Sequence, residues 1–178
     1  MRSWVMLVPC LVVGVACGPS WPRASFGPQN QCGQLRINDH VVKAELVSVG
    51  SPLQLKVSLW PDEPPYWHTP MTMRVSDRFR GDATGDVTVY TPYPVEGSIW
   101  GLALNRPDGT AYPTWSFLRF IDGHFWLGGA DLGVLHDDGR LVFANGEYAS
   151  ERAFLDALAT TSTQPDCAMS LPDRLDGK

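Results

Sequence analysis

Short segments in which apolar and polar residues alternate, each ended by turn-forming residues, recur through most of this sequence. The clearest is 53–60 (LQLKVSLW), where the apolar side chains would share one face of a strand. Asp-Gly pairs at 108–109, 122–123 and 138–139 suit tight turns between antiparallel strands. The pattern predicts about eight to ten short strands in an all-β fold, either a small barrel or a sandwich.

The positions of the turns predict which strands pair. Residues 41–49 end at a Gly-Ser-Pro turn, so we expect them to form a hairpin with 53–60. Residues 61–70 contain four prolines, which predicts a long surface loop, and 77–85 is expected to be a polar connection. Three further hairpins are expected, pairing 71–75 with 86–91, 115–121 with 124–127, and 133–136 with 140–143.

One segment, at about 150–160, has the features of a helix. Ser150 can cap it, and Glu151 places an anion in the first turn, where the helix dipole favours negative charge. Its apolar stripe consists of Phe154, Leu155 and Leu158. We expect this single late helix to pack on the barrel or sandwich.

The chain has 178 residues, which suits one ordinary globular domain. Its 14 Lys plus Arg against 19 Asp plus Glu give a net charge of -5, so nucleic acid is not expected as a partner. We expect a flexible tether at 17–31, a single β domain at 32–167 and a polar tail at 168–178. The tether assignment depends on the Gly, Pro, Ser, Asn and Gln content of that segment.

Residues 1–16 have the features of a signal peptide. Arg2 precedes an apolar run at 4–15 that is too short to span a bilayer as a mature helix. Such a segment is removed after export, so it is excluded from the fold. We therefore expect the protein to be exported.

Cys17 directly follows this apolar segment. The small residues Gly14 and Ala16 stand just before it, and 12–17 (VVGVAC) resembles a bacterial lipobox. The resemblance implies that Cys17 carries diacylglycerol and anchors the mature protein in the membrane of the cell envelope. The alternative is that Cys17 keeps a free thiol or forms an intermolecular disulfide, in which case the protein is secreted and soluble.

Cysteine counting predicts one disulfide. Removal of 1–16 discards Cys10 and leaves Cys17, Cys32 and Cys167, an odd number for a protein in an oxidising compartment. If Cys17 carries lipid, Cys32 and Cys167 are left to pair. That bridge would join the start of the domain to its end.

Several blocks of the predicted domain together resemble a known family. Near its start they are 41–49 and the segment from 73–75 through Phe79, Arg80 and Gly81 to 86–89. Near its end they are 133–135, 138–140 and the late helix. These blocks resemble the netrin-like domain, an OB-type barrel found in exported proteins. The resemblance implies a small barrel and a backbone turn at Gly81, and it transfers no functional residue. Inhibitors of that family act through the free amine of an N-terminal Cys, which acylation of Cys17 would block.

No motif for nucleophilic catalysis is found, and the four histidines lack the spacing of a zinc site, so neither a metal nor a cofactor is expected. One loop combines aromatic, acidic and imidazole side chains: Trp60, Asp62, Glu63, Tyr66, Trp67 and His68. Flat rings could stack on a sugar there. Asp62 and Glu63 could act as acid and base, or could be ordinary solvated acids. The tryptophans in strand-like runs are expected in the core: Trp100, Trp115 and Trp126.

The sequence therefore favours a lipid-anchored or secreted envelope protein that binds another envelope component without catalysis. Its expected partners are the membrane, through Cys17, and an envelope protein or a polysaccharide. The alternative is a hydrolase or carbohydrate-binding module that acts on a surface polysaccharide through 60–68.

Overall fold

The computed structural model describes residues 31–56, 65–92, 98–99, 102–144 and 146–168. Residues 1–30 and 169–178 lie outside this part, so the leader, the lipid on Cys17 and the tail stay predictions. None of the described helices is both long and apolar enough to cross a membrane. The elements in chain order are α1 (Gln31–Ile37), β1 (His40–Val49), β2 (Leu53–Leu55), β3 (Tyr66–Arg80), β4 (Gly85–Thr91), β5 (Ser98–Ile99), β6 (Leu102–Ala103), β7 (Pro113–Ile121), β8 (His124–Leu135), β9 (Leu141–Phe143), β10 (Gly146–Tyr148), α2 (Glu151–Ser162) and α3 (Pro165–Ala168).

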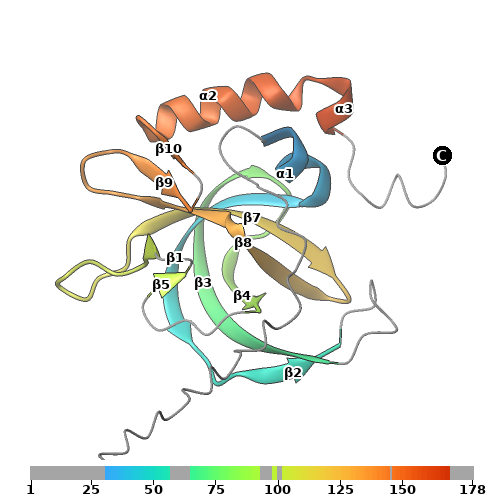
Figure 1. Cartoon of the computed structure of the whole chain (residues 1–178), viewed down its shortest axis with the longest axis vertical. Coiled ribbons are helices and arrows are strands. Elements are labelled where there is room, and N and C mark those ends of the chain that lie inside the picture. The colour runs from blue at the N-terminus through green and yellow to red at the C-terminus, as the bar shows by residue number, and fades with distance from the viewer. Residues whose placement is uncertain (1–30, 57–64, 93–97, 100–101, 145, 169–178) are drawn as a thin grey trace, which may run out of the picture.

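Eight of these strands form one mixed sheet that curls into a partial ring (Figure 1). The ring follows the order β4, β3, β1, β7, β8, and β8 then pairs with β4. That last pairing is parallel and joins only Val89 to Phe125 and Tyr90 to Trp126, whereas the other ring pairings are antiparallel. The all-β prediction with a C-terminal helix is therefore confirmed, with a partial ring in place of a true barrel.

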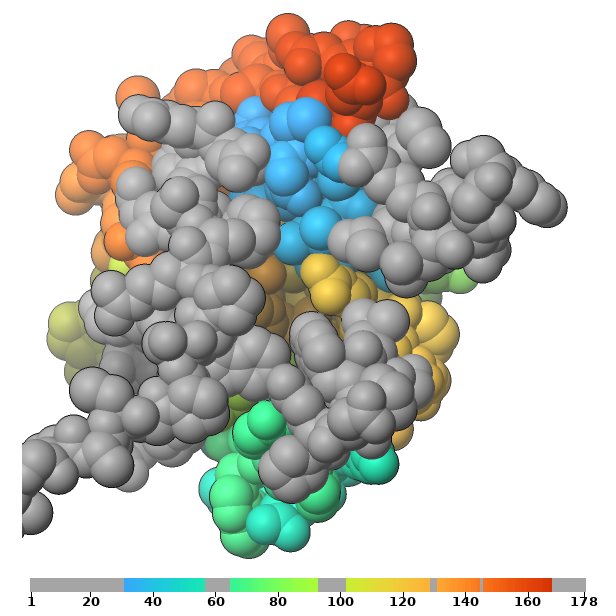
Figure 2. All heavy atoms as spheres, turned by 45° about the vertical axis from the view of Figure 1, so that its right-hand side comes forward, coloured from blue at the N-terminus to red at the C-terminus, as the bar shows by residue number. Residues whose placement is uncertain are grey.

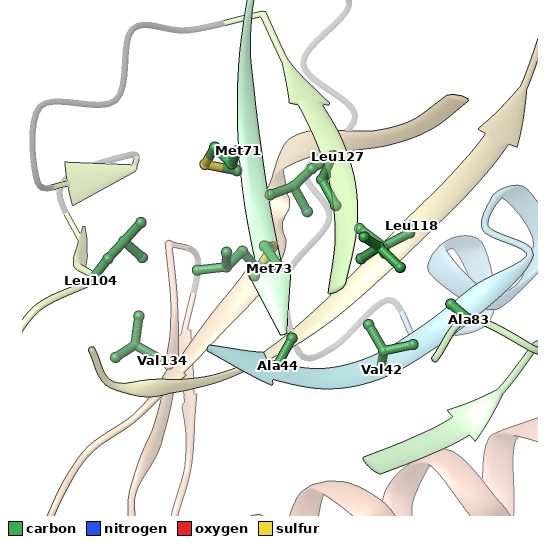
Figure 3. Packing of buried hydrophobic residues seen from close by; sticks show 12 residues of the cluster. Val42, Ala44, Met71, Met73, Ala83, Leu104, Leu118, Leu127 and Val134 are labelled. Carbon is green, nitrogen blue, oxygen red and sulfur yellow. The ribbon is translucent and has the colours of Figure 1, made fainter. Parts of the chain in front are cut away.

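The interior of the ring is filled by aliphatic and methionine side chains. Figure 3 shows them pointing toward one another from β1, β3, β7 and β8, among them Val42, Ala44, Met71, Met73, Leu118, Leu127 and Val134. All of these are at most 2% exposed. Burying a large aliphatic side chain stabilises a fold by about 1.5–3 kcal/mol, so this cluster holds the strands around one core.

A second core lies between the outside of the ring and α2, which crosses the top of the molecule in Figure 1. Trp115 and Phe117 of β7 contact Phe154 of α2, with ring centroids 5.6 and 6.1 Å apart. Ser150 caps the helix, and its side chain accepts a hydrogen bond from the backbone N–H of Ala153. The predicted helix and its cap are confirmed.

The predicted hairpin between 41–49 and 53–60 is wrong. β1 and β2 instead follow one another along the same edge of β3, where Val49 pairs with Met71 and Leu53 pairs with His68. At the junction the backbone N–H of Gly50 donates to the carbonyl of Pro70 at 2.8 Å. The Gly-Ser-Pro segment therefore interrupts the strand without reversing it, because β3 is long enough to pair with both pieces.

The predicted loop at 61–70 is also wrong in its second half, since β3 begins at Tyr66; residues 61–64 lie outside the described ranges. Pro70 is inside the strand. In a strand, the amide nitrogen and the carbonyl of one residue point to the same side, and the Pro70 carbonyl faces Gly50. The missing N–H of Pro70 therefore falls at the irregular β1–β2 junction and removes no hydrogen bond to β4.

Two further predicted breaks are replaced by strand. β3 continues to Arg80, so the connection expected at 77–85 is reduced to 81–84. β8 is one strand where two were expected, at 124–127 and 133–136. The polar residues at the end of β3 remain in strand conformation because β1 supplies their pairing, as when Arg78 pairs with Val42.

The prediction of a single helix is wrong, because α1 and α3 are also helical. Both are short, and neither has a long apolar period that would have indicated a helix. A disulfide joins Cys32 in α1 to Cys167 in α3, as the cysteine count predicts, across a sequence separation of 135. The ends of the described chain are thus held together beside α2.

Candidate functional site

Three neighbouring strands, β3, β4 and β8, carry aromatic side chains on the outside of the ring. Val89 and Leu127 point into the ring core, so strand alternation directs Tyr90 and Trp126 outward. Tyr90 and Trp126 are also register partners across the parallel pairing of β4 with β8. Two histidines contact Trp126 as well, and we call the whole group the aromatic face: His68, Tyr90, His124 and Trp126.

The four rings of the aromatic face pack at angles to one another. The His68 centroid lies 4.8 Å from that of Trp126, and Tyr90 lies 5.1 Å from His124, both at 76°. Tyr90 and Trp126 are 5.5 Å apart and tilted by 39°. Aromatic pairs are attractive at centroid separations of about 4.5–7 Å, so the rings hold one another in place.

His68 is the most enclosed member of the aromatic face, at 5% exposure. Its Nδ1 lies 2.9 Å from the carbonyl oxygen of Tyr66, which can only accept, so Nδ1 carries the proton. Burial lowers the pKa of His68, and the hydrogen bond to Tyr66 opposes that shift. The imidazole is therefore neutral at neutral pH, with Nε2 as an acceptor.

The remaining rings are partly exposed. The Trp126 indole N–H donates to the carbonyl of Ile121 at 3.1 Å, which fixes the orientation of the indole. Tyr90 and His124 flank it and contact one another. A ligand would therefore meet preformed ring surfaces of Tyr90, His124 and Trp126.

Polar residues continue the outer face along β3 and β4. Thr72 pairs with Thr88, and Arg74 pairs with Asp86 at the next position on the same face, two residues further along each strand. Arg74 donates to both carboxylate oxygens of Asp86, at 2.9 and 3.2 Å, and this hydrogen bonding lowers the pKa of Asp86. Hydroxyl groups and a paired guanidinium and carboxylate thus lie beyond the aromatic face.

The predicted loop residues are divided by the structure. Trp60, Asp62 and Glu63 lie outside the described residues. Tyr66 is partly buried, and Trp67 is 61% exposed, paired with Gln54 of β2. Neighbouring residues of a strand point to opposite faces, so Trp67 and His68 do not share a surface.

Three members of the aromatic face are not among the candidate site residues predicted from the sequence: Tyr90, His124 and Trp126. Of the tryptophans expected in the core, Trp115 is confirmed at 1% exposure and Trp100 lies outside the described residues. The expectation is wrong for Trp126, which belongs to neither buried core. Trp126 stands between Phe125 and Leu127 in the strand, so the alternation of side chains was a signal for its outward position. Only the pairing of β8 with β4 brings Trp126 beside Tyr90.

The chemistry of this face is stacking and hydrogen bonding. Within the described residues, no group of three or more His, Cys, Asp or Glu side chains is placed to hold a metal. Burial raises a carboxyl pKa at one described residue, Asp131, which lies in β8 beyond the aromatic face. Comparisons with protein-family models, with curated proteins and with solved structures find no match to this chain.

Proposed function

We propose that this protein is an exported binding protein of the bacterial cell envelope and that its aromatic face binds a surface polysaccharide. The observation that carries the proposal is the juxtaposition of His68, Tyr90, His124 and Trp126 from three strands on the outside of the ring. Binding to an envelope component without catalysis is also what the sequence favours.

A carbohydrate fits this surface better than other ligands do. The C–H groups of a pyranose form an apolar face that stacks on aromatic rings, while its hydroxyls need donors and acceptors nearby. Thr72, Thr88 and the Arg74–Asp86 pair supply both. Because the guanidinium is neutralised by Asp86 and the whole chain is acidic, the surface suits a neutral glycan and disfavours a polyanion.

Binding without turnover is the better-supported activity. A glycosidase needs a carboxylic acid that keeps its proton near neutral pH. The carboxyl group of Asp86, which lies beyond the aromatic face on the same strand as Tyr90, has a lowered pKa because Arg74 donates to it. The acids that the sequence offers for hydrolysis through the 60–68 loop, Asp62 and Glu63, lie outside the described residues.

The place of action rests on the sequence. The apolar segment 1–16 favours export, and Cys17 in a lipobox-like context favours a lipid anchor with the membrane as a partner. The intact mass of the protein from its own membrane fraction tests this: a diacylglyceryl and acyl addition at Cys17 supports anchoring. An unmodified Cys17 would make it a soluble secreted protein.

The binding proposal is tested by titrating the protein with soluble cell-wall and polysaccharide fragments while following tryptophan fluorescence and heat. A fragment that binds should bind Tyr90→Ala about fivefold more weakly, the loss of about 1 kcal/mol expected for one stacking contact. Phe120→Ala is the matched control, because Phe120 is 48% exposed and contacts His40 and Phe125.

Three outcomes would contradict the proposal. One is no binding of any fragment at millimolar concentration. The second is an equal loss of affinity in Tyr90→Ala and Phe120→Ala, which would place the ligand elsewhere. The third is release of shortened fragments during the titration, which would favour the hydrolase alternative.

A further inference from the structure

Strand β8 contains a bulge where it passes from the ring to the β9 side of the sheet. On β7, Ser116 pairs with Leu132 and Leu118 pairs with Leu127, so two residue steps on β7 face five on β8. Residues 128–131 of β8 thus lie opposite the single residue 117 of β7, so three of them are extra, and the segment includes two glycines. Bulges of this kind redirect a side chain, and here the redirected side chain is Asp131.

Asp131 is a carboxyl group in an enclosed position. It is 6% exposed, and its Oδ1 has no hydrogen-bond partner among the described residues. A Cβ atom at Gly128 would overlap Asp131 Oδ2, so only glycine at that position leaves room for the carboxyl group. The backbone N–H of Gly128 also donates to it.

Helix α1 packs next to this carboxyl group. The Gln34 side chain of α1 hydrogen-bonds to Asp131. Arg119 of β7 donates from Nε to the carbonyl of Ile37 at 2.8 Å, and its charge acts on both Asp131 and Asp39. Figure 2 shows α1, in blue, directly below α2 and α3 and beside the gold hairpin of β7 and β8.

We propose that Asp131 is a pH-sensitive latch for α1, which holds the helix against the ring when the carboxyl group is protonated and lets it open more often when the group is ionised. The latch is independent of the proposed ligand. It lies at the first described helix, directly after the segment predicted to tether the domain to the membrane. A change of pH outside the cell would therefore change the fraction of molecules in which α1, next to the predicted tether, is packed against the ring.

The direction follows from the surroundings of Asp131. Burial raises its pKa to about 6, and this effect exceeds the opposing attraction of Arg119 and the hydrogen bonds from Gln34 and Gly128. When α1 opens, water reaches the carboxyl group and its pKa returns toward about 4. The closed form is thus favoured below pH 4, and this advantage is lost as pH rises through 6.

The size of the effect is set by the pKa difference between closed and open forms. A difference of about two units changes the opening equilibrium by about a hundredfold. The disulfide between Cys32 and Cys167 stays intact, so the opening is local. Arg80 of β3, which donates to the carbonyl of Leu35, adds a further contact to α1.

The test is amide hydrogen exchange of α1 in the full-length protein between pH 4 and pH 7.5, corrected for the intrinsic pH dependence of exchange. The Asn38 amide, which donates to the Gln34 carbonyl at 3.0 Å, is one reporter. We expect its protection to fall about a hundredfold in the wild type and to stay flat in Asp131→Asn. Asp77→Asn, at an exposed position of β3, is the control and should behave as the wild type.

A wild-type protection factor that does not change with pH would overturn the proposal, as would the same change in Asp131→Asn. A titration of the Asp131 side-chain carbon by NMR in the unmodified protein needs no variant. A midpoint near 6 supports the latch, and a midpoint near 4 overturns it even where Asp131→Asn fails to fold.

Discussion

At Gly81 the chain requires both a left-handed backbone and the absence of a side chain. Its φ is +84°, and a Cβ atom there would overlap the imidazole of His40. That imidazole is held by Asp82, whose Oδ1 lies 2.9 Å from His40 Nε2. Gly109 offers a comparison, because its φ is +86° and a Cβ atom there would meet open space.

Replacing these two glycines separates backbone strain from steric overlap. Gly109→Ala should lower the free energy of unfolding by about 1 kcal/mol, the cost of a left-handed alanine. Gly81→Ala should lose about 2–3 kcal/mol, because His40 must move as well. Urea denaturation of both variants measures the difference, and equal losses would show that His40 yields without cost.

Only part of the candidate site could be predicted from single residues and their sequence neighbours. His68 could be singled out because it stands beside other aromatic residues in the sequence. Tyr90 and Trp126 could not, because their proximity depends on the pairing of β4 with β8. Asp131 resembles any surface aspartate in the sequence, and its burial depends on a bulge that only the paired strand reveals.

At the scale of elements, the start of α2 is held to the ring by one carboxylate. Glu151 Oε1 accepts from the Trp115 indole N–H at 2.7 Å and lies 2.7 Å from Lys43 Nζ. The Glu151 and Lys43 side chains are 29% and 24% exposed, so solvent screens this pair only in part. Glu151 therefore connects the first turn of α2 to both β1 and β7.

Removal of this carboxylate should loosen α2 from the ring. Glu151→Ala is expected to lower the free energy of unfolding by about 2 kcal/mol, because the buried Trp115 N–H loses its acceptor. Glu151→Gln keeps an acceptor and should lose less. Asp156→Ala, which removes an exposed pair with Arg152 on the same helix, should cost about 0.5 kcal/mol at most. Thermal unfolding measures these losses. Equal losses of unfolding free energy in Glu151→Ala and Asp156→Ala would contradict this account.

Local pattern predicted some elements well and others poorly. The strands at 41–49, 86–91 and 115–121 and the helix near 150–160 each carry their signal within a few residues, and each is confirmed. The errors fall where a long strand accommodates an irregular sequence, as β3 accommodates Pro70. Because β1 and β2 share that strand, a turn signal at Gly50 became an interruption without a hairpin.

At the scale of the whole molecule, the disulfide closes almost the entire described chain into one loop. Cys32 and Cys167 are 135 residues apart, and they hold α1 and α3 next to α2. Closing so long a loop restricts the unfolded chain strongly. The expected contribution to stability is about 5 kcal/mol in the chain-entropy account.

The double variant Cys32→Ser/Cys167→Ser should therefore lose up to about 5 kcal/mol of unfolding free energy relative to the oxidised wild type. Wild-type protein treated with a reductant serves as the matched comparison, and its denaturation midpoint should coincide with that of the variant. An unchanged midpoint on reduction would mean that the bridge adds nothing to stability.

The sequence by itself determined the strand-rich composition of the fold, the late helix with its cap, and the cysteine pair that forms the bridge. These properties depend on period-two alternation, capping and residue counting, all of which act locally or by elimination. The tertiary structure alone decided the partial ring, the aromatic face on its outer side and the burial of Asp131. Each of these requires segments far apart in the chain to meet, and the register and curvature of the paired strands determine which side chains then face one another.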